Sequence, residues 1–106
     1  MLELDRHCTL PDEDVLARAH ALTEYWAKKH NVTVSWKNDR EVHLSGRVMG
    51  VKFDGRVQIG EGKIHAEMNA GFLAEKLGGR AYVQRKLDDY LDPARSLAEL
   101  RARIPT

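Results

Sequence analysis

Apolar residues first recur every three or four positions, which is typical of one face of an amphipathic helix. This stripe consists of Val15, Ala19, Leu22 and Trp26. Pro11 and the acidic residues 12–14 suit the start of a helix, where the backbone dipole is positive, and the basic residues 28–30 suit its end. Asn31 is a plausible C-cap. The sequence therefore predicts a helix that begins near residue 11 and ends near residue 30.

From residue 32 the period changes to two, as expected for strands with one apolar face. Four consecutive antiparallel strands are predicted, at about residues 32–37, 41–49, 51–59 and 63–69. The apolar phase shifts by one residue at Met49-Gly50, so this dipeptide is either a tight hairpin turn or a bulge in one long strand. A looser alternation over residues 2–8 predicts a short edge strand.

Helical spacing returns in the last third of the chain. The double glycine Gly78-Gly79 predicts a break or kink, because each glycine costs a helix about 1 kcal/mol relative to alanine. A closing helix follows, with an apolar stripe of Val83, Leu87 and Leu91. We expect Asp92 to cap a short tail helix and Pro93 to occupy its first position.

The predicted order of elements is β-α-β-β-β-β-α-α, which indicates an α+β fold with helices packed on one face of an antiparallel sheet. Residues 1–92 are expected to form a single α+β domain. Residues 93–106 are expected to form a C-terminal helical tail, packed on this domain or on a partner. Exposed sheet edges and the apolar stripe of the tail also make a homodimer plausible.

Composition narrows the class of protein. The chain has 106 residues, 17 basic and 16 acidic side chains, a formal net charge of +1 and one cysteine. A disulfide-stapled scaffold is excluded, and nucleic-acid binding driven by bulk charge is not expected. No apolar run is long enough to suggest a membrane span, and we expect a reduced, cytoplasmic location.

The polar residues suggest no established chemistry. His43 and His65 lie on different predicted strands and could become neighbours on the polar sheet face, but metal sites usually need three or four ligands. Cys8 and His7 are adjacent on a strand, so their side chains point to opposite faces. We therefore predict no catalytic residues, no metal site and no cofactor.

The remaining candidate is a helical apolar surface. Its residues precede the double glycine or lie in the tail: Phe72, Leu73, Leu77, Leu97, Leu100 and Ile104. They could pack in the core, against a second copy, or against an external apolar surface.

Several strings resemble the polyhydroxyalkanoic acid system family, small bacterial proteins often linked with polyester granule genes. They include Arg6-His7, the helix from Ala19 to Trp26, and the segment from Met49 to Val57. The strand from Lys63 to Met68 and the segment Gly71-Phe72-Leu73 continue the likeness, which spans roughly residues 4–91. The family has no assigned catalytic residues to carry over.

This resemblance implies a non-enzymatic accessory protein that associates with polyester granules or their coat proteins. An alternative is a small hydrophobic-ligand binding module, in which an acyl chain would lie between sheet and helices and a kink at Gly78-Gly79 would open the pocket. An enzyme with an unfamiliar site is the third hypothesis.

Overall fold

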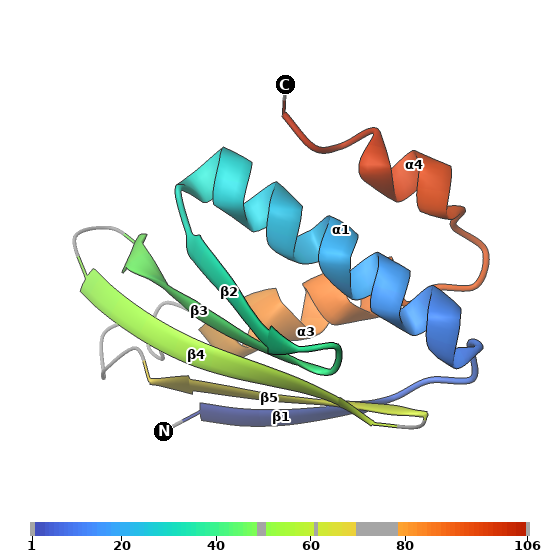
Figure 1. Ribbon diagram of the computed structural model, residues 1–106, viewed down its shortest axis with the longest axis horizontal. Coiled ribbons are helices and arrows are strands. Elements are labelled where there is room, and N and C mark those ends of the chain that lie inside the picture. Colours follow the sequence, from blue (N-terminus) through green and yellow to red (C-terminus); the bar gives the residue numbers. More distant parts are fainter. Residues whose placement is uncertain (1, 49–50, 61, 70–78, 106) are drawn as a thin grey trace.

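A single antiparallel sheet organises the chain (Figure 1). The computed structural model describes residues 2–48, 51–60, 62–69 and 79–105. The strands are β1 (Leu2–His7), β2 (Thr33–Asn38), β3 (Glu41–Val48), β4 (Val51–Gly60) and β5 (Lys63–Asn69). The helices are α1 (Asp12–His30), α3 (Gly79–Tyr90) and α4 (Leu97–Arg101). The predicted order of elements and the α+β class are confirmed.

The strand order is β1-β5-β4-β3-β2, so the first and last strands of the sequence lie side by side. Consecutive strands from β2 to β5 pair as hairpins, while β1 joins the far edge by pairing with β5. β1 and β2 are consequently the two edges of the sheet. The pairing of β1 with β5 is the long-range contact that brings the amino-terminal residues beside residues 63–68.

The pairing of β3 with β4 decides between the two interpretations of the phase change. Val48 lies opposite Val51, and the two strands run antiparallel from there. They are therefore two strands of a hairpin, not one long bulged strand. Met49 and Gly50 themselves lie outside the described residues. In the next hairpin Gly62 has a φ of 69°, a left-handed conformation that glycine adopts without a steric penalty.

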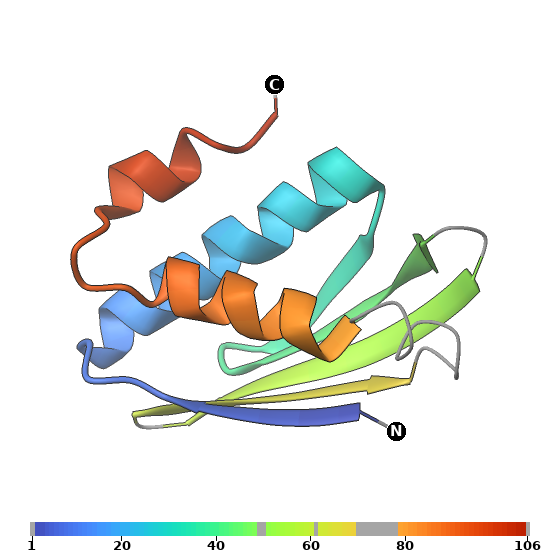
Figure 2. The same ribbon diagram turned by 180° about the vertical axis from the view of Figure 1, so that it is seen from behind.

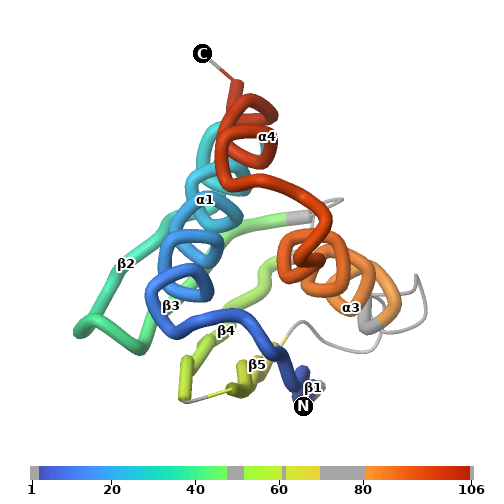
Figure 3. Tube along the Cα trace, turned by 90° about the vertical axis from the view of Figure 1, so that its right-hand side faces the viewer, coloured from blue at the N-terminus to red at the C-terminus, as the bar shows by residue number. Residues whose placement is uncertain are grey.

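Both long helices cover the same face of the sheet (Figure 2), as predicted. The stripe on α1 is buried against apolar residues that alternate along the strands, including Val42, Leu44 and Ile64. Trp26 is buried in this core, and its Nε1 donates a hydrogen bond to the hydroxyl of Tyr82 at 3.2 Å. None of the described helices lies on the opposite face of the sheet (Figure 3), where polar residues point outward.

The ends of α1 follow the sequence signals. Pro11 precedes its first residue, and residues 12–14 place three carboxylates in the first turn. At the other end Asn31 has a φ of 56°, the left-handed conformation typical of a C-cap, and its backbone N–H donates to the carbonyl of Trp26. The predicted C-cap is confirmed.

The predicted start of the tail helix is wrong. Asp92 does not cap a helix; its Oδ1 accepts a hydrogen bond from the backbone N–H of Ala94 at 2.9 Å, which forms a turn. The helix begins later, at Leu97, because Ser96 caps it by accepting from the backbone N–H of Glu99 at 3.1 Å. α4 packs against α1, on the side away from the sheet (Figure 3).

Among the described residues, no helix is both long enough and apolar enough to cross a membrane.

Candidate functional site

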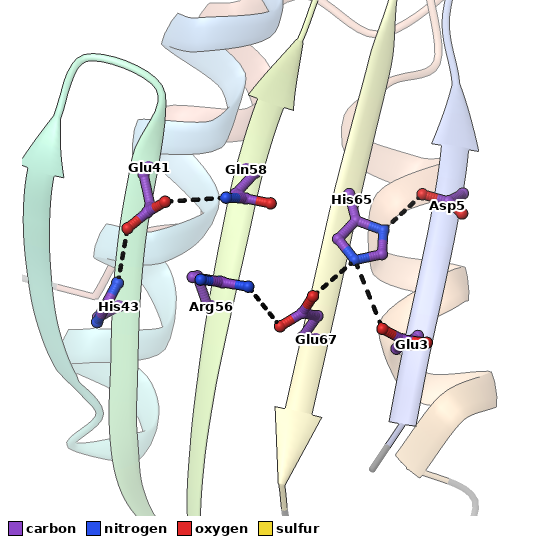
Figure 4. A network of polar contacts seen from close by, with 8 residues as sticks. All are labelled: Glu3, Asp5, Glu41, His43, Arg56, Gln58, His65 and Glu67. Atoms are coloured by element: carbon purple, nitrogen blue, oxygen red, sulfur yellow. Dashed lines mark hydrogen bonds and ion pairs between the residues drawn. The ribbon is translucent and has the colours of Figure 1, made fainter.

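The polar face of the sheet gathers most of the interacting ionisable side chains outside the helices (Figure 4). Because successive residues of a strand point to opposite faces, burial of Val42 and Leu44 against the helices turns Glu41 and His43 outward. The same alternation turns His65 and Glu67 outward from β5. Strands far apart in the sequence thus contribute to one open surface.

His65 is the centre of one cluster on this face, which also contains Glu3, Asp5 and Glu67. Its Nδ1 lies 2.6 Å from Oδ1 of Asp5, and its Nε2 lies 3.0 Å from Oε1 of Glu67. Oε1 of Glu3 is 4.0 Å from the same Nε2. The pairing of β1 with β5 sets this geometry, because Asp5 lies opposite His65 and Glu3 lies opposite Glu67.

Two further sets of contacts lie between this cluster and β3. Nη2 of Arg56 donates to Oε2 of Glu67 at 2.8 Å. On the next pair of strands, Nε2 of Gln58 donates to Oε1 of Glu41 at 3.0 Å, and the other oxygen of Glu41 lies 2.9 Å from Nε2 of His43. His43 and His65 therefore share the polar face, as predicted, but they are separated by β4 and are not neighbours (Figure 4).

The hydrogen bonds of the network favour its charged forms. The bond to Asp5, and then the bond to Glu67, raises the pKa of His65. The bond to His65 in turn lowers the pKa of Asp5 and the pKa of Glu67. Bonds from Gln58 and His43 lower the pKa of Glu41. The carboxylates of this face consequently stay ionised, and His65 holds a proton more firmly than an isolated histidine.

A shallow, open hollow of about 450 Å³ lies beside the network on the same face. Its lining includes Lys37, His43, Asp54, Arg56 and Glu67, together with hydroxyl groups from β2 and β3. This hollow is open to solvent and lies on the outer face of the sheet, with Leu44 and Met68 also in its lining. The predicted alternative of an acyl-chain pocket instead requires an apolar space between sheet and helices. In the described residues that layer holds the packed core side chains. Gly78, at the predicted mouth, lies outside the described residues.

One group of side chains has the spacing of metal ligands. Single ligand atoms of Glu3, His65 and Glu67 all lie within 4.8 Å of one another. Sequence reasoning missed this group because about sixty residues separate Glu3 from the other two. The outward phase of His65 and Glu67 was visible in the sequence, but the pairing of β1 with β5 was needed to add Glu3.

The predicted apolar surface is divided by the structure. Leu100 is 0% exposed and belongs to the core cluster, so of the three predicted alternatives it adopts core packing. Leu97 is partly buried against the same core, and Ile104 is partly exposed. The other three candidates, Phe72, Leu73 and Leu77, lie outside the described residues.

These observations define a small α+β protein with an apolar, helix-covered sheet face and an open face of paired charges. The chain belongs to the family described as "Putative polyhydroxyalkanoic acid system protein", whose model matches residues 2–94. The match covers every described strand together with α1 and α3, and it ends before α4. The resemblance seen in the sequence is confirmed. Searches of the curated proteins and of the solved structures found no match to this chain.

Proposed function

We propose that the protein is a non-enzymatic accessory component of the polyhydroxyalkanoate system, which associates in the cytoplasm with polyester granules or their coat proteins. The observation that carries this proposal is the family match, which extends over the whole sheet and both long helices. A family defined by the polyhydroxyalkanoate system supports a role where that polymer is made, stored or used.

The chemistry of the polar face supports a role without catalysis. General acids at neutral pH need a carboxyl group whose pKa is raised, usually by an apolar pocket. The carboxyl groups of Asp5, Glu41 and Glu67 instead have lowered pKa values and lie in ion pairs on an open surface. His65 is held by two carboxylates and favours the protonated form, which is a poor general base.

The packing of the tail limits which apolar side chains can contact a granule. Burying apolar surface contributes about 25 cal/mol per Å², so a few exposed leucines suffice for weak, reversible attachment. Leu100 is already buried within its own chain and is not available for this. Among the sequence candidates we propose Phe72 and Leu73, which lie outside the described residues, as the contact side chains to test first.

Co-sedimentation of the purified full chain with isolated granules tests the proposal. We expect more protein in the granule pellet than for an unrelated protein of similar size and net charge. A parallel sample with protein-stripped polymer particles distinguishes the two partners: binding to both indicates the polyester surface, and binding to native granules alone indicates their coat proteins. Pelleting no greater than the unrelated protein with either particle would contradict the proposal.

A pair of variants tests where the contact lies. Replacing both Phe72 and Leu73 with serine should reduce the pelleted fraction severalfold, whereas the matched variant Ile104→Ser in the tail should pellet like the original chain. Thermal melting of each variant confirms that it is folded. Equal loss of binding in both variants would contradict the proposed contact through Phe72 and Leu73.

A further inference from the structure

We propose that Glu3, His65 and Glu67 form a binding site for a divalent metal ion of the zinc type, which joins β1 to β5. The sequence alone predicts no metal site, because it does not bring three ligands together. The proposal is independent of granule association, so either can fail without the other.

The three side chains supply the atoms that zinc prefers, one imidazole nitrogen and two carboxylate oxygens. Ligands about 2.0–2.2 Å from a tetrahedral zinc ion lie roughly 3.3–3.6 Å from one another. Nε2 of His65 is 3.0 Å from Oε1 of Glu67 and 4.0 Å from Oε1 of Glu3. The side chain of Glu3 is 61% exposed, and the longer of these distances would shorten when an ion binds.

Zinc would displace the proton that Nε2 of His65 shares with Glu67, and the neighbouring side chains hold the ligands in place. Asp5 lies 2.6 Å from Nδ1 of His65, and a carboxylate at this position orients the ring so that Nε2 faces the metal. Arg56 occupies Oε2 of Glu67, which leaves Oε1 directed toward His65 as a single ligand atom. Figure 4 shows Nε2 of His65 facing both glutamates, with Asp5 on the other side of the ring.

The strand register supplies an independent reason for a cation. Glu3 and Glu67 are direct partners across two antiparallel strands, and like charges in this position repel. Arg56 and protonated His65 offset part of this repulsion. A divalent ion between their carboxylates converts this repulsion into a link across the edge of the sheet. Three protein ligands leave one tetrahedral position for water.

The same face contains a second histidine, His43, that serves as a matched comparison for His65. His43 also contacts a glutamate, Glu41, but the second neighbour of that glutamate is the amide of Gln58, not another carboxylate. Within the described parts of the chain, the group around His65 is the one with three ligand atoms at metal-site spacing. His43→Gln is therefore the control for His65→Gln.

Calorimetric titration of the tag-free, chelator-treated full chain with zinc chloride at neutral pH tests the site. We expect one ion per chain and a rise in melting temperature with zinc. His65→Gln should weaken binding by at least about tenfold, Asp5→Asn should weaken it by about tenfold, and His43→Gln should leave it unchanged. In the unsubstituted chain, nitrogen NMR should show zinc shifting the Nε2 resonance of His65 more than that of His43.

Three results would overturn the proposal. They are no heat and no melting shift at micromolar zinc, binding by His65→Gln equal to that of the original chain, or equal weakening by His43→Gln. The NMR readout does not depend on any variant, so a poorly folded variant leaves the test intact.

Discussion

Arg18 is the residue whose role differs most from what its place in the sequence suggests. It lies on α1 and is only 6% exposed, although arginine is seldom buried without a partner. Its guanidinium group donates to the backbone carbonyls of Tyr90, Asp92 and Arg95, at 3.0, 2.9 and 2.6 Å. α3 ends at Tyr90 and has no basic residue in its own last turn. Arg18 supplies a positive charge at this negative end of the helix dipole from another helix.

Arg18→Met tests this role. Methionine keeps an unbranched apolar side chain but removes the side-chain donor from the buried carbonyl of Tyr90 and from the part-buried carbonyls of Asp92 and Arg95. We therefore expect a loss of about 2 kcal/mol in the free energy of unfolding. Urea denaturation followed by circular dichroism measures it. Arg18→Lys should recover only part of the loss, because an ammonium group cannot reproduce the planar fork of donors. A change within about 0.5 kcal/mol for the methionine variant would show that these hydrogen bonds are not stabilising.

At the scale of elements, the joint between α3 and the tail depends on Asp89. Its carboxylate forms ion pairs with Arg95 and Arg103, which lie on either side of α4. Burial raises the pKa of Asp89, but the hydrogen bond from Arg103 and the charges of both arginines outweigh it, so the pKa is lowered overall. The ionised carboxylate therefore stabilises the docked tail.

This joint predicts a pH-dependent difference between the original chain and Asp89→Asn. Because the pKa is lower in the folded state than its ordinary value of 3.8, the contribution is complete above that value and is lost as pH falls through the folded pKa. We expect the variant to be less stable by about 1 kcal/mol at neutral pH, and the two proteins to converge in strong acid. Urea denaturation at neutral pH and in strong acid measures the difference in the free energy of unfolding between the two proteins.

Glu99→Gln is the matched control for Asp89→Asn. Glu99 contacts Arg95 at 3.5 Å as an exposed i,i+4 pair within the tail, so its neutralisation should change stability by less than about 0.5 kcal/mol at either pH. A difference between Asp89→Asn and the original chain that is the same at neutral and acid pH would contradict the role of the ionised carboxylate.

The elements themselves were predictable because their signals are local. Alternation with a period of two gave the strands from β2 to β5, and the left-handed cap at Asn31 gave the end of α1. The start of α4 was not predictable in the same way, since Asp92 and Ser96 are both good capping residues. Only the turn formed by Asp92 with Ala94 shows which of the two begins the helix.

At the scale of the whole molecule, the sequence does not reveal which distant segments lie side by side. The sequence indicated that His65 and Glu67 face outward, but the pairing of β1 with β5 adds Glu3 and Asp5 to them. The same holds for Arg18, whose partners lie more than seventy residues away. Hydrophobic periodicity identifies the face on which a residue lies, whereas candidate sites depend on contacts between faces and elements that only the folded chain specifies.

The family match ends at residue 94, so α4 lies beyond it. The question for this helix is whether it stabilises the fold or contacts a partner. Leu100 is 0% exposed and closes the core over α1, so its side chain stabilises the fold instead of offering an outward surface. Leu100→Ala should lower the free energy of unfolding by about 3 kcal/mol, through lost apolar burial and the cavity left behind. Leu97→Ala, at a partly buried position of the same helix, should lower the free energy of unfolding clearly less. Urea denaturation of both variants measures these losses. Co-sedimentation, under conditions in which both variants remain folded, measures granule binding. Unchanged stability of Leu100→Ala together with lost granule binding would instead identify the tail as the contact surface.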